Sequence, residues 1–515
     1  MTAPFSNEHK DSAACELVSR DCPMTGPMRG QIQSGKLAGK TLRQAIWIVA
    51  LPVLIQQTLG AFVGLIDKML AGGLPKDIVV ASLDGLGIGS YVGWLIAIAM
   101  TGMGIGGQAL IARAIGGGKT DEASHALGQA LTLGVLWSVL VAVVMYFVAP
   151  VLAEICGLQG DATIACVQYV RMLCIALPGT ALMMVGAMCL QGAGETLWPA
   201  IIGVVVNIVN VVFSWLLSGA TITIAGRAFV SPLEMNWYVE GIAAGTVIGW
   251  AVGGLLTLWV VTRGVKDLKL RHEHVPVHRG MSRRVIRIGL PNFFEGLSMW
   301  SANLVCLWII GLVAGIAATT GSIWTLDGLL PLATGGEGLV GAHVISIQWE
   351  AFSFLPGFAI GTAAAALAGQ YLGAGNEAMA RKAVWTCVGL GMVVMGSLGI
   401  VFIFAGSFLT SIVSDEPVYM SLVPDLLVVC GVMQIFFAMS MVVRQALRGL
   451  GDTTWVFWIT TASSYGIRLP MAWVFGIVFE WGLVGVWIGL CGEMVFRAMF
   501  FLCRFTWGGW AKKQL

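Results

Sequence analysis

A glycine-rich stretch occurs twice in this chain, and the two copies are 257 residues apart. RAIGGGKTDEASHA begins at Arg113 and QYLGAGNEAMARKA begins at Gln370 (370 − 113 = 257). A second pair, QGAGETLW from Gln191 and RGLGDTTW from Arg448, has the same offset (448 − 191 = 257). Two gapless matches at one spacing, close to half of the 515 residues, indicate a duplicated unit. The sequence therefore predicts a fold built from two like halves.

Composition places both halves in a membrane. Hydrophobic residues make up 57% of the chain and charged residues 11%, whereas a soluble domain carries about 25% charged residues. A water-soluble globular fold is thereby excluded. The net charge of +2 gives no reason to expect nucleic acid as a partner, so the expected surroundings are the lipid bilayer.

Apolar stretches long enough to cross a bilayer as helices follow one another along the chain. We expect an all-α membrane protein with twelve transmembrane helices, six in each half. The predicted spans of the first half are 44–72, 84–111, 124–149, 163–191, 197–219 and 239–262. Those of the second half are 288–315, 338–372, 382–411, 419–447, 455–479 and 482–505.

The predicted domain boundaries follow from these spans. We expect a disordered cytoplasmic tail at 1–40 and an N-terminal six-helix lobe at 41–263. A basic cytoplasmic linker at 264–287 leads to a C-terminal six-helix lobe at 288–505 and a cytoplasmic tail at 506–515. We expect the protein to be a monomer.

Basic residues gather on one side of the predicted membrane topology. The loop between the sixth and seventh helices holds Arg263, Lys266, Lys269, Arg271, Arg279, Arg283, Arg284 and Arg287. Arg448 is assigned to a loop on the same side, and the opposite loops hold only Lys76 and Arg227. Positive residues stay in the cytoplasm. This predicts a multi-pass protein of the cytoplasmic (inner) membrane with both termini in the cytoplasm.

Four ionisable side chains lie within the predicted helices and are candidates for function. Such a group costs at least about 2.5–3.5 kcal/mol in the hydrocarbon, so it usually faces a cavity. Asp67 is in the first helix, where pairing with Lys68 is the alternative interpretation. Glu295 and Glu350 have no basic neighbour in sequence, and we expect them to face a shared cavity. Arg468 is interpreted as a structural counter-charge, with either glutamate as a possible partner.

Polar residues and prolines mark further candidate positions. Asn207 and Asn210 are three residues apart, hence on one helix face, and Ser214 lies one turn further on. We expect Asn210 and Ser214 to share a polar cavity with the aspartate of the first helix. Pro291 is interpreted as lying at a helix start. Pro356, which a glycine follows, is expected to bend or open its helix and to free backbone carbonyls.

With these motifs the chain resembles the multidrug and toxic compound extrusion (MATE) family of transporters over roughly Leu42 to Arg504. In the first half the resemblance rests on ALPVLIQQTLGAFVGLIDKMLAG, RAIGGGKTDEA and LQGAGET. In the second half it rests on GLPNFFEG, EAFSFLPGFAIGTAAAALAGQYLGAGN, ALRGLGDT and RLP. It implies two lobes related by a pseudo-twofold axis along the membrane normal, with substrate bound between or within them and export driven by sodium ions or protons.

The resemblance also implies roles for single residues. Asp67 matches the aspartate of the family's first helix, and Glu295 and Glu350 lie where the family often has acids. Ser214 stands where many members have an acid, so a two-carboxylate site in the N-terminal lobe is in doubt.

The predicted function is an ion-gradient-driven (proton or sodium) antiporter that exports small amphipathic, often cationic, organic compounds. No cofactor is expected beyond the coupling ion, because the sequence contains no nucleotide-binding signature. No metal site is expected, although sodium would suit the carboxylates. The alternatives are a lipid or oligosaccharide flippase, which a basic central cavity would favour, and a membrane-embedded enzyme. Few cations are predicted within the helices, and no polar catalytic cluster is found. The compound, the coupling ion and the lobe that carries coupling stay open.

Overall fold

The computed structural model is almost entirely helical. It describes residues 31–75, 78–155, 160–224, 227–229, 231–233, 235–326, 328–331 and 338–513. Residues 1–30 of the predicted tail and the loop position of Lys76 lie outside the described residues.

Each half contributes six long helical segments within the described part of the chain. Those of the first half are α2 (Leu42–Gly72), α3 (Val79–Gly116), α4 (Thr120–Ile155), α5 (Asp161–Gly192), α6 (Leu197–Ser218) and α7 (Tyr238–Arg263). Those of the second half are α8 (Arg279–Thr320), α9 (Leu339–Gly373), α10 (Glu377–Ser411), α11 (Pro417–Gly449), the segment that contains α12 (Thr453–Ser463) and α13 (Leu469–Trp473), and α14 (Gly482–Trp507). Two π-helical turns, Ser464–Arg468 and Val474–Val478, follow α12 and α13. Two hairpins, β1 (Ile222–Ile224) with β2 (Arg227–Phe229) and β3 (Ser322–Thr325) with β4 (Gly328–Pro331), are antiparallel.

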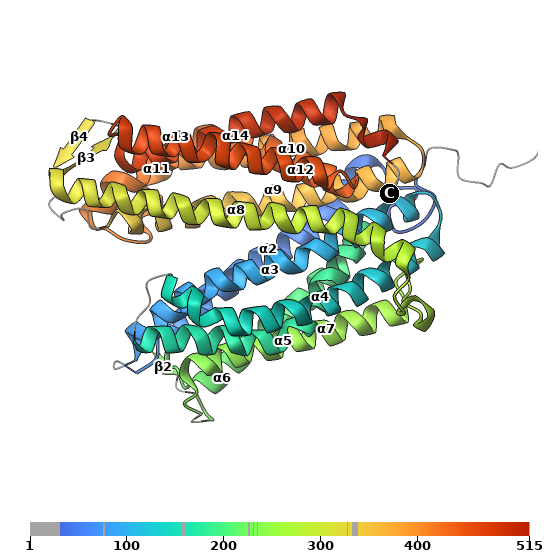
Figure 1. The fold of residues 1–515 in the computed structure, drawn as a ribbon, viewed down its shortest axis with the longest axis horizontal. Coiled ribbons are helices and arrows are strands. Elements are labelled where there is room, and N and C mark those ends of the chain that lie inside the picture. The colour runs from blue at the N-terminus through green and yellow to red at the C-terminus, as the bar shows by residue number, and fades with distance from the viewer. Residues whose placement is uncertain are drawn as a thin grey trace, which may run out of the picture.

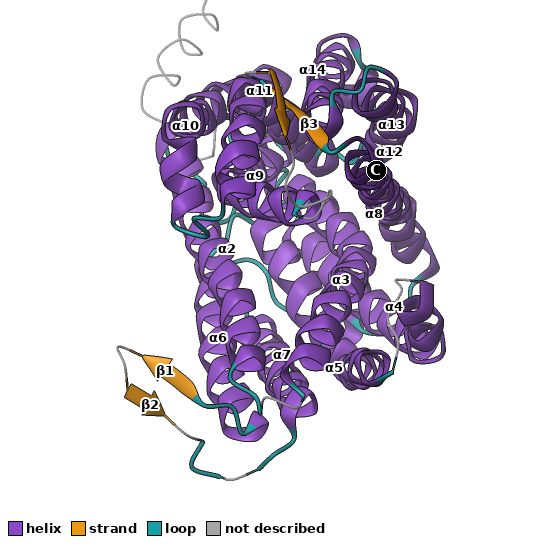
Figure 2. Ribbon diagram, turned by 90° about the vertical axis from the view of Figure 1, so that its left-hand side faces the viewer, coloured by secondary structure: helices purple, strands orange, loops and turns teal. Residues whose placement is uncertain are grey.

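The helices form two bundles, which confirms the predicted all-α membrane fold with two six-helix lobes. Figure 1 shows α2 to α7 in one bundle and α8 to α14 in the other, close together at the end where the C terminus lies and further apart at the end with the hairpins. Figure 2 shows the helices of both bundles nearly end-on. Eleven of the described helices are long and apolar enough to cross a membrane.

The first helix of each half also packs against the second helix of the other half. Val49 of α2 belongs to the same buried core as Ile360 of α9. Correspondingly, Val285 of α8 belongs to the same core as Ile111 of α3. The two bundles are therefore joined by exchanged helix contacts.

The two halves also meet at the repeated glycines, where backbone lies directly against backbone. A Cβ added at Gly116 would overlap the backbone of Gln370, and one added at Gly373 would overlap the backbone of Arg113. Because Arg113 corresponds to Gln370 at the 257-residue offset, these are two copies of one contact, related by the pseudosymmetry. The repeated connectors therefore lie side by side at one end of the molecule, and the repeat is parallel rather than inverted. We call this end the connector end.

The second repeated motif is also conserved between the halves in its geometry. Gly194 and Gly451 both have a φ of +80°, a left-handed conformation that only glycine adopts without strain. The amide of Gly194 donates to the carbonyl of Gln191, and that of Gly451 to the carbonyl of Arg448, each at 2.9 Å. The duplication thus extends to individual backbone hydrogen bonds.

Both terminal segments are packed at the connector end, where the sequence analysis expects tails. Leu37 is 1% exposed, and Lys36 forms an ion pair with Glu195 at 2.6 Å. Trp510 is fully buried and stacks on Phe505 with ring centroids 5.2 Å apart. The disordered-tail prediction is therefore wrong for residues 31–40, and the segment that follows α14 is packed as far as residue 513, because both carry an apolar anchor that is buried.

The predicted basic linker, 264–287, is shorter than expected because α8 begins at Arg279. The side chain of His278 caps this helix by accepting from the amide of Met281 at 3.4 Å. Met281 is 6% exposed, so the first turns of α8 bury an apolar face against the N-terminal lobe. The arginines that suggested a loop lie on the other face of an amphipathic helix.

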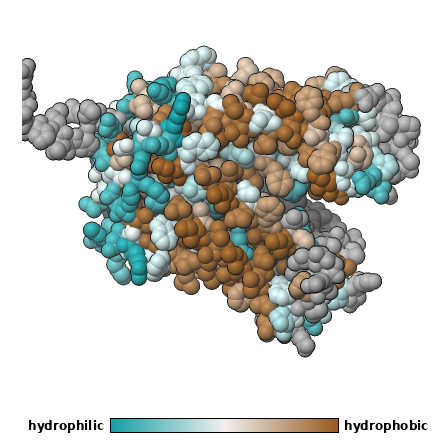
Figure 3. All heavy atoms as spheres, turned by 180° about the vertical axis from the view of Figure 1, so that it is seen from behind, coloured by the Kyte–Doolittle hydropathy of each residue, from teal (hydrophilic) through white to brown (hydrophobic). Residues whose placement is uncertain are grey.

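The surface of the molecule has the pattern of a membrane protein. Figure 3 shows a broad apolar surface over the helices and hydrophilic side chains gathered at the connector end. Large apolar side chains such as Phe404 and Trp507 are 84% and 85% exposed. In water such exposure would be costly, whereas lipid solvates it.

Candidate functional site

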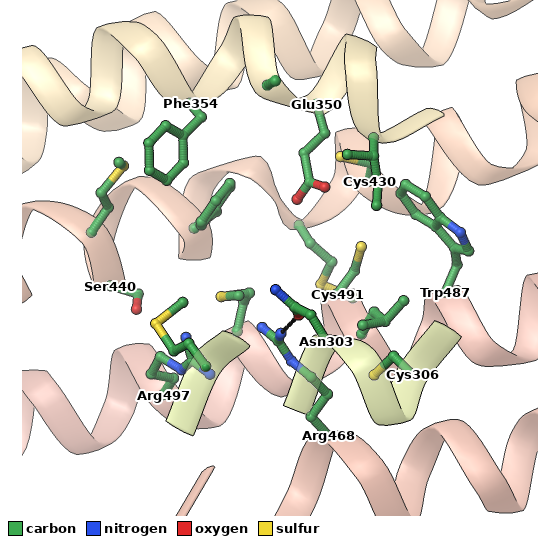
Figure 4. Close-up of a pocket in the computed structure, with 18 of the residues that line it drawn as sticks. Asn303, Cys306, Glu350, Phe354, Cys430, Ser440, Arg468, Trp487, Cys491 and Arg497 are labelled. Atoms are coloured by element: carbon green, nitrogen blue, oxygen red, sulfur yellow. Dashed lines mark hydrogen bonds between the residues drawn. The ribbon is translucent and has the colours of Figure 1, made fainter. Parts of the chain in front are cut away.

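A cavity of about 440 Å³ lies inside the C-terminal lobe (Figure 4). Its apolar lining includes Leu304, Phe354, Phe437, Met441 and Trp487. Its charged lining residues are Glu350, Arg444, Arg468 and Arg497. Trp94 of α3 reaches the cavity from the N-terminal lobe. A mostly apolar cavity of this size with a few convergent charged groups is typical of a small-molecule binding site.

Glu350 projects from α9 into this cavity. Figure 4 shows its carboxylate pointing towards Arg468 and Asn303, which rise from the opposite side. The helix continues through Pro356, from Leu339 to Gly373, so the proline does not end it. Because proline has no N–H, the carbonyl four residues earlier, that of Phe352, loses its usual helical donor.

A second glutamate, Glu493 of α14, holds two of the cavity's arginines. Arg497 donates to it at 2.7 Å, and Arg468 donates twice, at 3.3 and 3.2 Å. The hydroxyl of Ser463 also donates to this carboxylate. Arg468 donates in addition to Asn303 Oδ1 at 3.1 Å. Glu493 and Arg497 are four residues apart on α14 and form an intrahelical ion pair.

Arg468 belongs to a π-helical turn, Ser464–Arg468, which brings two polar side chains to the cluster. Ser464 accepts a hydrogen bond from Arg497 Nη2 at 2.9 Å. π-Helical turns often occur at functional sites because the extra residue redirects neighbouring side chains. The partners of Arg468 are Glu493 and Asn303 rather than either glutamate that the sequence analysis considers.

Glu295 is in α8 but is not among the residues that line the cavity. It is fully buried, and Arg448 donates to it from Nη2 at 2.7 Å and from Nε at 3.2 Å. The hydroxyl of Thr460 donates to the other oxygen at 3.1 Å. The prediction that Glu295 and Glu350 share a cavity is therefore wrong. Arg448, which the sequence analysis assigns to a loop, reaches into the lobe from the last turn of α11 and binds Glu295.

Pro291 likewise lies elsewhere than predicted. It is inside α8, which starts at Arg279, three turns before the proline. The interpretation of Pro291 as a helix start is wrong, because α8 continues upstream into the linker.

Sequence reasoning missed Arg444 and Arg497 as cavity residues. Arg444 is 8% exposed and Arg497 is 1% exposed. The available signal was the spacing of Arg444 and Arg448, which are four residues apart and hence on one helix face. An arginine within an apolar run was as strong a signal as the glutamates.

In the N-terminal lobe, Asp67 of α2 is half-buried. Its Oδ1 atom is buried with no hydrogen-bond partner among the described residues. Lys68 is exposed, and no ion pair joins it to Asp67 in the part of the chain that the structure describes. The alternative interpretation of Asp67 as the partner of Lys68 is thus not supported.

The polar residues of α6 bind the neighbouring helix α7. Asn210 donates to Thr246 at 2.8 Å, and Ser214 donates to the carbonyl of Ile242 at 3.1 Å. Asn207, one turn earlier, is half-buried. The Oδ1 atom of Asn210 is buried without a partner in the described residues. A cavity shared with Asp67 stays a prediction.

Comparison with known proteins agrees with this architecture. The MatE family model matches residues 52–216 and 325–474. The probable multidrug resistance protein NorM of Thermotoga maritima is 26% identical over 475 residues, which cover 92% of this chain and 94% of the relative. The multidrug resistance protein MdtK of Yersinia pseudotuberculosis is 22% identical, covering 90% and 95%.

Solved structures show the same fold. A MOP superfamily transporter from Pyrococcus furiosus, described as having a binding pocket of reverse polarity, superposes with a TM-score of 0.79 at 19% identity, covering 95% of this chain and all of that chain. A MATE family transporter in an outward-facing conformation gives 0.77 at 19% identity, covering 92% and 98%. Together with the duplicated lobes and the matched family model, these findings show that the chain belongs to the multidrug and toxic compound extrusion (MATE) family of membrane transporters.

Proposed function

We propose that this transporter is an ion-gradient-driven antiporter that exports amphipathic organic compounds across the cytoplasmic membrane. The observation that carries the proposal is the cavity of the C-terminal lobe, whose aromatic and methionine walls surround the carboxylate of Glu350. Apolar walls suit many compounds, and an ionisable group among them responds to an ion gradient. The relatives named for multidrug resistance support export as the direction.

The arrangement of the lobes supports alternating access. The lobes touch through Gly116 and Gly373 at the connector end. A hollow between them opens at the other end (Figure 3). Basic side chains gather at the connector end, as expected of a cytoplasmic face. With the connector end and both termini in the cytoplasm, the hollow faces outwards.

Two carboxylates are the candidate coupling groups. Glu350 faces the C-terminal cavity, and Asp67 has an unpartnered oxygen in the N-terminal lobe. The free Oδ1 of Asn210 is a further acceptor. Carboxylate and amide oxygens take up either a proton or a sodium ion, and each would remove a buried charge and shift the equilibrium between the two faces. Glu295 is not proposed as a coupling group, because Arg448 already neutralises it.

Transport by purified protein in lipid vesicles tests this proposal. Vesicles are loaded with the fluorescent cation ethidium, and a proton gradient and a sodium gradient are imposed separately. We expect one gradient to drive ethidium movement. Asp67→Asn or Glu350→Gln should abolish the response, whereas Asp161→Asn, which changes an exposed carboxylate, should not. Transport indifferent to both gradients would refute antiport, and normal responses in both variants would make the carboxylates structural.

A flippase remains the second candidate because the cavity is basic. The sequence analysis expects few cations within the helices, and this expectation is wrong: Arg444, Arg468 and Arg497 line the cavity. A flippase would move a fluorescent short-chain phosphatidylglycerol between leaflets and leave ethidium where it is. An antiporter of soluble compounds would give the opposite result.

A further inference from the structure

The charged side chains in and directly behind the C-terminal cavity do not balance. The guanidinium groups are those of Arg444, Arg448, Arg468 and Arg497, and the carboxylates are those of Glu295, Glu350 and Glu493. The net charge is +1 when Glu350 is ionised (4 − 3) and +2 when Glu350 is neutral (4 − 2). Buried charges are usually paired, so this part of the lobe has an excess of positive charge.

The excess is located at Arg444. Glu493 is occupied by Arg468 and Arg497, and Glu295 is occupied by Arg448. Arg444 approaches Glu295 only to 3.7 Å, which is beyond hydrogen-bonding distance.

Within the described residues, Arg444 has fewer acceptors than its guanidinium group can bind. Its Nη1 contacts the sulfur of Met299 at 3.3 Å, and thioether sulfur is a weak acceptor. The side chain is only 9% exposed. Its Nε is buried and has no hydrogen-bond acceptor among the described residues. A buried guanidinium in a cavity without a full set of acceptors indicates that a ligand supplies the missing ones.

The chemistry that fits is an oxyanion attached to an apolar body. A guanidinium binds carboxylate, sulfonate and phosphate oxygens through two parallel N–H groups. Phe354, Phe437 and Met441 offer the apolar surface for the rest of the molecule. We infer that the C-terminal cavity binds amphipathic organic anions, with Arg444 as the main contact of the oxyanion. This inference rests on the proposed function in taking the cavity as the substrate site.

Glu350 then sets the charge of the site. When ionised it repels the oxyanion, and when neutralised by a proton or sodium ion it leaves the net charge at +2. Neutralisation of Glu350 should therefore strengthen the binding of an oxyanion at Arg444.

Equilibrium binding to the purified full-length protein in neutral detergent tests the inference. The probes are radiolabelled taurocholate, an amphipathic sulfonate, and radiolabelled tetraphenylphosphonium, an amphipathic cation. We expect the wild type to bind taurocholate more tightly than tetraphenylphosphonium. Arg444→Gln should weaken taurocholate binding at least about tenfold, the loss of one charge-assisted hydrogen bond. It should not weaken binding of the cation.

Two further variants separate charge from folding. Arg444→Lys keeps the charge and should retain taurocholate binding better than Arg444→Gln does. Glu350→Gln should bind taurocholate at least as tightly as the wild type. Size-exclusion chromatography shows whether each variant is folded. If Arg444→Gln is not folded, the inference is tested by the wild-type preference between the two probes and by taurocholate binding to Glu350→Gln.

Three outcomes would overturn the inference: no taurocholate binding by the wild type, equal binding by folded Arg444→Gln, or weaker binding by Glu350→Gln. Competition identifies the source of the oxyanion. Displacement of taurocholate by short-chain phosphatidylglycerol but not phosphatidylcholine assigns the site to a lipid headgroup, and no displacement by either assigns it to a soluble anion. Gradient-driven ethidium transport without taurocholate binding refutes this inference and leaves the proposed function standing. Taurocholate binding without any gradient-driven transport refutes the proposed antiport and leaves the inferred anion site standing.

Discussion

Replacing Glu295 by glutamine should destabilise the protein rather than uncouple transport from the ion gradient. The carboxylate is fully buried and accepts two hydrogen bonds from Arg448 and one from Thr460. Glu295→Gln leaves the guanidinium of Arg448 without its counter-charge. Removing one partner of a buried ion pair typically costs about 3–5 kcal/mol, and two charge-assisted hydrogen bonds at about 1.5–3 kcal/mol each give a similar figure.

This free energy should be visible as a shift of the unfolding midpoint. One kcal/mol lowers Tm by about 2–4 °C for a unit of about 150–250 residues. If the C-terminal lobe unfolds as such a unit, Glu295→Gln should lower Tm by roughly 6–20 °C. The assay is thermal unfolding in detergent with a thiol-reactive fluorophore, because Cys387 of the C-terminal lobe is fully buried and should react when the lobe unfolds.

A double variant shows whether the loss belongs to the ion pair. Glu295→Gln combined with Arg448→Gln removes both charges, so the coupling free energy between the two sites should be about 2 kcal/mol or more. Glu377→Gln is the control, since it breaks an exposed pair with Arg381 and should cost less than about 1 kcal/mol. A Glu295→Gln protein with wild-type Tm that has lost its response to the ion gradient would refute this reasoning and return Glu295 to the coupling site.

Three further predictions follow from the connectors, the C-terminal segment and the N-terminal lobe. Gly116→Ala should lower stability by at least about 1–3 kcal/mol, because its Cβ would overlap the facing backbone. Gly389→Ala, where a Cβ meets open space, should not lower stability. Equal melting temperatures of the two variants would contradict the close contact at Gly116. Trp510→Ala should cost about 3–5 kcal/mol by leaving a cavity, while Trp507→Ala, at an exposed side chain, should change stability by less than about 0.5 kcal/mol in the same assay. Asp67→Asn should impair ethidium transport in vesicles more than replacing the lysine that follows it by alanine, and the reverse ranking would make this aspartate structural.

The helices and the duplication were predictable because both are recorded locally in the sequence. A run of some 20 apolar residues has few alternatives to a membrane helix, and a fixed offset between motifs needs no knowledge of packing. Accordingly, the predicted span 163–191 lies within the observed Asp161–Gly192, and the predicted span 197–219 differs from Leu197–Ser218 by one residue.

The pairing of buried charges was not predictable in the same way. Glu295 has no basic neighbour in sequence, yet Arg448, 153 positions away, neutralises it. Which arginine reaches which glutamate depends on how three helices pack, and single-helix patterns do not contain that information. The prediction of disordered terminal segments was wrong for a related reason. A single apolar residue such as Leu37 or Trp510 is buried only because another part of the chain provides a surface for it.

If the two lobes rock against each other as proposed, the crossing of Gly116 with Gly373 would act as a pivot at one end of the molecule. Helix α3 has 38 residues and ends at this crossing, so at about 1.5 Å per residue its arm is about 57 Å long. A rotation of about 10° at the pivot would carry the far end of α3 through about 10 Å, roughly the diameter of a helix. At the crossing itself backbone meets backbone without intervening side chains, which suits a pivot if the lobes rock as proposed.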